Sequence, residues 1–229
     1  MDSRPEGEVE AVRIVDLTFP IQEGMLTFPA PHHPFVEITQ LARHGVENRE
    51  TRKVVLGTHT GTHCDAPLHF IAGGSTVDQI PPEVLVGPAA VCDFSSREGG
   101  AIDVADIEAA LGGRRASRIL LRFGWSRNYG KIEYYSGHPY LAPAAAERLV
   151  QRGVKLLGMD TPQPDDPRHG RAAEVDSPIH KILLGAGVVL VEYLCNLELL
   201  TTPEVQLIVA PLKILGGDGA PARCFAIVG

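Results

Sequence analysis

Side chains that bind metals are concentrated in one short segment of this sequence. Residues 57–70 read GTHTGTHCDAPLHF and contain three histidines, one aspartate and one cysteine. Imidazole and carboxylate groups are common ligands of Zn²⁺ and Mn²⁺. Two imidazoles and one carboxylate would leave coordination positions open for water and substrate, which is typical of a catalytic metal site. The segment therefore predicts a metal site that does chemistry.

The conformation of this segment decides which of its side chains can meet. His59 and His63 are four residues apart, as in helical zinc motifs, but the intervening Thr-Gly-Thr and the following Pro67 disfavour a helix. We therefore expect an extended chain, in which alternate side chains share a face. The residues of one parity are then His59, His63, Asp65 and His69, and Cys64 points the other way. Pro67 would bend the chain, so His69 need not stay in line with the others.

A metal held by His59, His63 and Asp65 would activate a water molecule. Such a metal can lower the pKa of a bound water to roughly 7. His69 follows just beyond these ligands, where a general base would assist. The alternative is a chance group of surface histidines. The chain has nine histidines, and four ligand-type residues of one parity within eleven positions argue against that alternative.

Strands and short helices must position these residues. Apolar and alternating segments predict strands at 12–18, 35–42, 51–63, 89–95, 118–123, 154–160, 188–194, 205–213 and 223–229. Capping and terminating residues, such as the cap Asp103, predict helices at 103–113, 142–153 and 177–187. The mixed order of strands and helices predicts one α/β domain with a mixed β-sheet and a few helices.

Composition limits the partners and the compartment. The chain has 229 residues, a net charge of −7 and no run of Lys or Arg, so we expect neither nucleic acid nor a membrane as a partner. No apolar run approaches the roughly 18 residues of a membrane helix, and the polar N-terminus is unlike a signal peptide. Four widely spaced cysteines indicate reduced thiols in a cytoplasmic protein. We predict a flexible tail at residues 1–10 and a single domain at 11–229.

The segment HTGTHCDAPLH resembles the signature of the metal-dependent cyclase/hydrolase family, which includes bacterial kynurenine formamidases, isatin hydrolases and polyketide cyclases. The resemblance extends over most of the chain, through VRIVDLTFPIQEGMLTFP, LLGMDTP, HKILLGAGVVLVEYLCNLELL and VQLIVAPLKILGGDGAPARCFAIV. It implies a swivelling β/β/α-like cyclase fold. It also implies a homo-oligomer, a dimer or tetramer, that acts on a small-molecule substrate.

The resemblance also implies a role for each residue of the site. His59, His63 and Asp65 would bind a first Zn²⁺ or Mn²⁺, and His69 would be the catalytic acid/base. His180 and Glu192 would complete a second site with Asp65 as the bridge, in members that use two ions. Glu192 lies in apolar sequence, where a buried carboxylate needs a partner. The alternatives are an ordinary ion pair for Glu192 and a satisfied core histidine for His180.

The expected reaction is hydrolysis of a C–N bond in a formamide, an amide or a cyclic amide. One alternative is a metal-dependent cyclase of secondary metabolism, and another is a metal-binding scaffold without activity. Formamidases of the family carry Trp-Pro-Gly in the first loop, where this chain has Thr27-Phe28-Pro29-Ala30, and residues 123–141 are longer than in a formamidase. Both departures favour isatin-hydrolase-like members or another substrate.

Several further residues have two interpretations. Asp160 would hydrogen-bond a ligand histidine or cap a loop, and His138 would line the pocket or lie outside it. A local group of aromatic residues would form a substrate wall, a subunit contact or plain core: Trp125, Tyr129, Tyr134 and Tyr135. The remaining histidines are expected to be solvated, although their loops could cover a site: His32, His33, His44 and His169.

Overall fold

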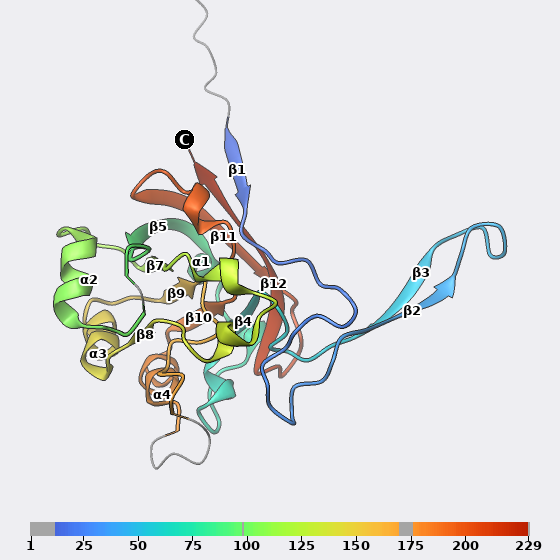
Figure 1. Cartoon of the computed structure of the whole chain (residues 1–229), viewed down its shortest axis with the longest axis horizontal. Coiled ribbons are helices and arrows are strands. Elements are labelled where there is room, and N and C mark those ends of the chain that lie inside the picture. Colours follow the sequence, from blue (N-terminus) through green and yellow to red (C-terminus); the bar gives the residue numbers. More distant parts are fainter. Residues whose placement is uncertain (1–11, 98, 170–175, 229) are drawn as a thin grey trace, which may run out of the picture.

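An eight-stranded mixed sheet organises the chain (Figure 1). The computed structural model describes residues 12–97, 99–169 and 176–228. The strands, in sheet order, are β1 (Arg13–Asp16), β12 (Gly219–Val228), β11 (Glu204–Pro211), β5 (Val86–Asp93), β7 (Arg118–Arg122), β9 (Leu156–Met159), β10 (Val189–Glu192) and β4 (His63–Asp65). Strands β5, β7, β9 and β10 run parallel. Because β12 also pairs with β4, the sheet closes into a barrel-like arrangement.

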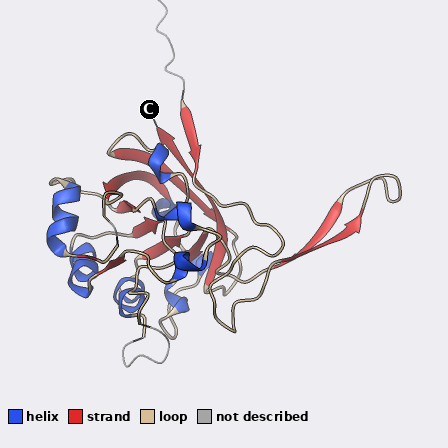
Figure 2. Ribbon diagram, in the orientation of Figure 1, coloured by secondary structure: helices blue, strands red, loops and turns tan. Residues whose placement is uncertain are grey.

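Helices cover one face of the parallel strands (Figure 2). They are α2 (Val104–Leu111), α3 (Pro143–Gln151) and α4 (Pro178–Gly185), whereas the short helix α1 (Pro82–Leu85) packs against the apolar cluster of the barrel interior. The three predicted helices are confirmed. As expected, Asp103 caps α2, and its carboxylate accepts the N–H of Asp106 at 2.9 Å.

The parallel strands bury both of their faces, which explains their nearly continuous apolar sequence. Ile119 and Leu121 of β7 pack against the helices, whereas Leu120 packs inside the barrel with residues of β11 and β12. Cys64 of β4 also points into the barrel interior. All four cysteines are free and buried, as predicted.

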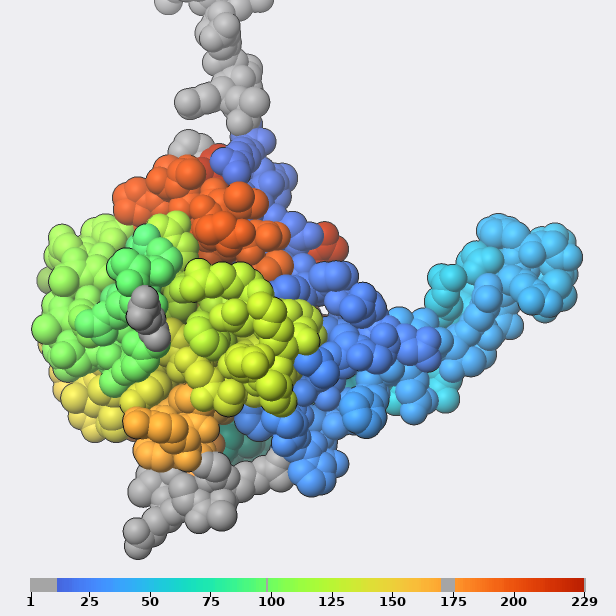
Figure 3. Space-filling view, viewed as in Figure 1, coloured from blue at the N-terminus to red at the C-terminus, as the bar shows by residue number. Residues whose placement is uncertain are grey.

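A two-stranded arm projects from this body (Figures 1 and 3). It consists of β2 (Glu37–Ala42) and β3 (Thr51–Val55), which pair with each other in a separate two-stranded sheet. Apolar side chains along the arm are exposed, among them Leu41 at 59% and Val54 at 51%. The strand predicted at 51–63 is too long, because the observed strand β3 ends at Val55 and the chain then turns.

The remaining elements are short. They are β6 (Ala101–Ile102), β8 (Tyr140–Leu141) and the 3-10 helices Pro67–His69, Val77–Gln79, Trp125–Asn128, Ile132–Tyr135 and Leu197–Leu199. Among the described residues, the helices are too short to cross a membrane. The predicted mixed α/β fold is confirmed. The predicted tail at residues 1–10 lies outside the described residues.

Candidate metal centre

Strand pairing brings His63 and Glu192 together. In the antiparallel pair of β4 and β10, His63 lies directly opposite Glu192 and Asp65 lies opposite Leu190. Residues opposite each other in such a pair project to the same face. His63 and Asp65 therefore face Glu192, while Cys64 enters the barrel, as the extended conformation predicts for these three residues.

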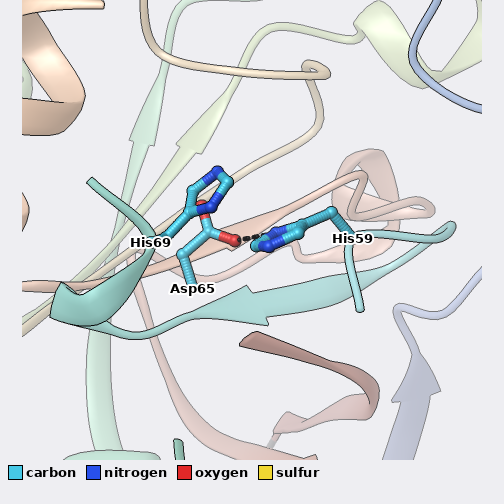
Figure 4. Close-up of side chains that lie close together, drawn as sticks. All are labelled: His59, Asp65 and His69. Carbon is cyan, nitrogen blue, oxygen red and sulfur yellow. Dashed lines mark hydrogen bonds and ion pairs between the residues drawn. The ribbon is translucent and has the colours of Figure 1, made fainter. Parts of the chain in front are cut away.

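His59 and His69 reach the same place by a different route. His59 lies in a turn before Gly61, whose φ of +59° is a left-handed conformation that suits glycine. His69 ends the 3-10 helix that begins at Pro67. The expectation that His59 lies on the extended strand is wrong, because the chain turns there, whereas the bend expected at Pro67 is present and takes His69 out of line. Their rings nevertheless stack at 3.8 Å between centroids, beside Asp65 (Figure 4).

Helix α4 supplies His180 to the site. Ser177 adopts a left-handed conformation and Pro178 begins the helix, which places His180 in its first turn. The carboxylate of Asp165 accepts the N–H of Ile179 at 2.7 Å and lies 2.5 Å from His180 Nδ1. Asp165 fixes this histidine, and the sequence interpretation missed it because no local pattern links positions 165 and 180.

Five buried side chains converge into two overlapping sets of ligand atoms. Asp65 Oδ1 lies 2.7 Å from His59 Nδ1 and 3.1 Å from His63 Nε2. Glu192 Oε2 lies 3.5 Å from His63 Nε2. The second oxygens of both carboxylates face His180 Nε2, at 3.7 Å from Asp65 Oδ2 and 3.2 Å from Glu192 Oε1. One set thus comprises His59, His63 and Asp65 Oδ1, and the other comprises His180, Asp65 Oδ2 and Glu192 Oε1, so Asp65 is shared between them.

The donor atoms fit a cation. Asp65 Oδ2 and Glu192 Oε1 are buried and accept no hydrogen bond from any described residue. Buried carboxylate oxygens that accept no hydrogen bond are costly, and a bound metal would satisfy them. His69 also lies near enough to His59 and Asp65 to be a ligand itself. The predicted metal residues are therefore brought together, and they could hold one or two ions.

The second nitrogen of each imidazole is already engaged. Nδ1 of His63 lies 2.8 Å from the carbonyl of Gly61, and Nδ1 of His180 contacts Asp165. Nε2 of His59 lies 2.8 Å from the carboxylate of Asp218. Such acceptors fix the tautomer of ligand histidines and leave the other nitrogen for the metal. The nitrogens left over all face Asp65 or Glu192.

The ionisable groups of the site shift one another's pKa values. Burial opposes protonation of His59, but Asp65 and Asp218 outweigh it and raise the pKa of His59 to about 10. Burial would raise the pKa of Asp65, yet His63 and His59 hold it well below its usual range. Burial, and then the charge of Asp65, raise the pKa of Glu192. A cation that binds here would take the place of protons.

A cavity of about 630 Å³ opens onto the site. Phe28, Tyr135 and Tyr193 supply aromatic walls, and His69 also lines it. Three histidines that were expected to be solvated line the cavity instead: His32, His33 and His169. His44 is exposed on the arm, as expected. Of the aromatic group, Tyr135 lines the cavity, whereas Tyr134 is fully buried in the adjoining aromatic cluster.

Two open questions from the sequence are answered by contacts. Asp160 accepts the backbone N–H groups of Phe123 and Trp125, each at 2.9 Å, so it caps a loop and binds no ligand histidine. Burial raises the pKa of Asp160 to about 6. His138 is buried and does not line the cavity, and its Nδ1 lies 3.1 Å from the carbonyl of Pro139.

Gly219 allows close packing against His59. A Cβ at this position would lie 2.7 Å from the carbonyl oxygen of Cys64 and 2.7 Å from His59 Cε1. We expect Gly219→Ala to displace His59, weaken metal binding and lower stability by roughly 1–3 kcal/mol. Thermal unfolding and metal titration measure both effects. Gly185→Ala is the control, because its Cβ would meet Ile71 at an ordinary 3.6 Å, and an equal effect of both variants would contradict the prediction.

Similarity to known proteins agrees with this geometry. The family model described as "Putative cyclase" matches residues 15–166. A kynurenine formamidase of Salinibacter ruber is 32% identical over 217 residues, which cover 92% of this chain and 95% of that protein. Isatin hydrolase A of Labrenzia aggregata, solved with benzyl benzoate, has a TM-score of 0.85 at 29% identity, covering 95% of this chain and 94% of that one. A potential metal-dependent hydrolase with cyclase activity has a TM-score of 0.77 at 30% identity, covering 95% and 98%.

These relatives confirm the predicted class of enzyme, a metal-dependent amidohydrolase that acts on C–N bonds other than peptide bonds. The ligand sets and the metal-dependent relative support a metal cofactor. The family model and the formamidase both span most of the chain. The chain therefore belongs to the Cyclase family.

Proposed function

We propose that this enzyme hydrolyses the C–N bond of a small aryl or cyclic amide, such as an isatin-like lactam or an aryl formamide. One observation carries the proposal: the buried carboxylate of Asp65 is shared between two ligand sets, and Glu192 and the histidines of both sets line a cavity of about 630 Å³. A cavity of this volume accommodates a small aromatic substrate. Phe28 and Tyr135 offer flat apolar surfaces for a ring.

We assign the metal ligands as the sequence predicts. His59, His63 and Asp65 would hold the first ion, and His180 and Glu192 would hold the second together with Asp65. The ion would be Zn²⁺ or Mn²⁺, with one or two per subunit. When bound, it supplies Lewis-acid polarisation of the amide carbonyl and lowers the pKa of water.

His69 is the residue we propose to move protons. Its side chain is 22% exposed at the cavity, and its ring lies against that of His59. It takes a proton as water attacks and returns it to the leaving nitrogen. Because water is the nucleophile in this reaction, no serine or cysteine nucleophile is needed and no acyl-enzyme is expected. Tyr135 stays a neutral wall, because burial raises its pKa to about 12.

An absorbance assay tests the reaction. Purified enzyme loaded with Zn²⁺ or Mn²⁺ is given isatin in one series and N-formylkynurenine in another, with the metal-free enzyme as the blank. We expect turnover of one of them that disappears in the blank. If metal is bound and neither substrate reacts, other cyclic amides are tested next. A ring-closed product from an open precursor, without amide hydrolysis, would favour the cyclase alternative.

We further propose that the chain forms a homo-oligomer, a dimer or tetramer, in the cytoplasm. A two-stranded hairpin is marginally stable by itself, yet β2 and β3 extend away from the body with exposed apolar side chains. A second copy of the chain that packs against the arm would cover them. The arm also follows the 28–33 segment that lines the cavity, so such packing would stabilise the cavity wall.

Charged substitutions in the arm are expected to weaken the assembly of the oligomer. Leu41→Glu and Val54→Glu would each place a charge where roughly 1.5–3 kcal/mol of apolar burial is expected per side chain. The dissociation constant of the oligomer should rise roughly 10–100-fold. Light scattering after size exclusion measures the mass. Ile132→Glu is the control, because Ile132 is 66% exposed and lies outside the arm. Arm variants with unchanged mass at all concentrations would exclude the arm as the contact.

A further inference from the structure

Asp218 contacts two histidines to which we assign different tasks. Its Oδ2 lies 2.8 Å from Nε2 of His59 and 3.6 Å from Nδ1 of His69. The first is a hydrogen-bond distance, and the second is that of an ion pair. The two rings are stacked with an angle of 28° between their planes, so one oxygen can face both. The sequence interpretation used the segment that holds Asp218 only as part of the family resemblance and gave Asp218 no role.

The backbone fixes the position of Asp218. Its carbonyl accepts the N–H of Ala66, the residue after Asp65, at 2.9 Å. The carbonyl of Gly217 accepts the N–H of Val77 at 2.8 Å, and the carboxylate of Asp78 accepts the N–H of Gly216 at 2.9 Å. The next residue, Gly219, packs directly against His59. Asp218 is therefore anchored to the segment that carries the ligands, unlike a surface carboxylate that meets a histidine by chance.

We infer that Asp218 is a positioning residue that acts on both His59 and His69, an inference that rests on the proposed function. By accepting the proton of His59 Nε2, it leaves Nδ1 of His59 directed at Asp65 and the metal. By facing Nδ1 of His69, it favours the tautomer that leaves Nε2 for the reacting molecule. The carboxylate of Asp218 thus orients both the proposed metal ligand His59 and the proposed acid/base His69.

Two variants and a charge-matched control test the inference. Asp218→Ala removes the acceptor, and Asp218→Asn keeps an oxygen but loses the charge. Both are made in the wild-type and His69→Ala backgrounds. Asp78→Asn is the control, because it removes a charge beside the same loop and keeps the oxygen that anchors Gly216. The hydrogen bonds of the Asp78 side chain go to Gly216 and Thr76, not to His59 or His69. Thermal unfolding verifies that each variant is folded.

Zn²⁺ affinity, measured by competition with a chromophoric chelator, is the first readout. We expect Asp218→Ala to weaken it about 10–100-fold in both backgrounds, with a smaller effect for Asp218→Asn and none for Asp78→Asn. This readout needs no substrate, so it remains decisive if the proposed reaction is wrong. Affinities of both variants within about threefold of wild type would overturn the role at His59.

The tautomer of His69, read by NMR of ¹⁵N-labelled histidine in the Zn²⁺-loaded protein, is the second readout. We expect the proton on Nδ1 in the wild type and a shift toward Nε2 in Asp218→Ala. An unchanged tautomer would overturn the role at His69. With a substrate that turns over, kcat at saturating Zn²⁺ should fall about 10–100-fold in the wild-type background and remain unaffected in His69→Ala. Equal losses in both backgrounds would show that Asp218 does not act through His69.

Discussion

Replacing His69 with alanine is expected to lower kcat by about 10²–10⁴-fold while the metal stays bound, because general acid–base catalysis contributes a factor of that size. His69 is the least buried imidazole among those at the centre, and its stacking against His59 places it at the cavity. Loss of a proton carrier changes kcat more than it changes substrate binding. Steady-state kinetics and metal analysis of the same preparation measure the two effects.

The metal content of the His69→Ala variant distinguishes two roles that the geometry allows for His69, proton carrier and metal ligand. Because His69 lies within ligand distance of His59 and Asp65, a variant that loses metal together with activity would identify His69 as a ligand. A variant with full activity would exclude both tasks. His44→Ala serves as the control, since His44 is exposed on the arm and its replacement should leave kcat unchanged.

Replacing Asp65 with alanine is expected to abolish metal binding at both positions. Its two oxygens face different ligand sets, toward His63 and toward His180. A metal supplies several kcal/mol of transition-state stabilisation, so activity should fall by roughly 10³-fold or more. The metal-free protein should also lose about 3–5 kcal/mol of stability, because the buried imidazoles lose their shared counter-charge. Elemental analysis, kinetics and thermal unfolding measure these three quantities.

A gentler variant keeps this prediction decisive if the alanine variant does not fold. Asp65→Asn preserves the shape of the side chain but removes its charge, and we expect it to lose metal as well. Asp166→Asn is the control: Asp166 is also a buried carboxylate, but its hydrogen bonds go to Arg168 and the adjoining loop. Normal metal content in Asp65→Asn would contradict the assigned role.

The sequence alone predicted the chemical identity of the centre. His59, His63 and Asp65 lie within seven positions, so their types and density are visible without a fold. The resemblance added His180 and Glu192, whose distance along the chain hides their common site. Capping residues such as Asp103 predicted the helices, because caps act within one turn.

The alternation argument from the sequence holds for only part of the segment that carries the candidate ligands. Alternation holds for His63 and Asp65, which lie on β4, but His59 and His69 lie in a turn and a 3-10 helix. Parity describes neighbours on one strand and does not extend beyond a turn at Gly61 or a proline at position 67. The sequence interpretation expected His32, His33 and His169 to be solvated for a related reason: a polar loop sequence does not reveal whether the loop folds over a cavity.

Only the tertiary structure decided how the centre is held. Asp165 and Asp218 fix His180 and His59 from distant parts of the chain. Asp218 precedes β12, and β4 pairs with both β10 and β12. This pairing closes the barrel and brings Asp218 beside the segment that carries His59 and Asp65. Local composition determines which side chains are able to bind a metal. Contacts between distant segments determine which nitrogen each imidazole presents, because hydrogen-bond partners are set by the closed sheet.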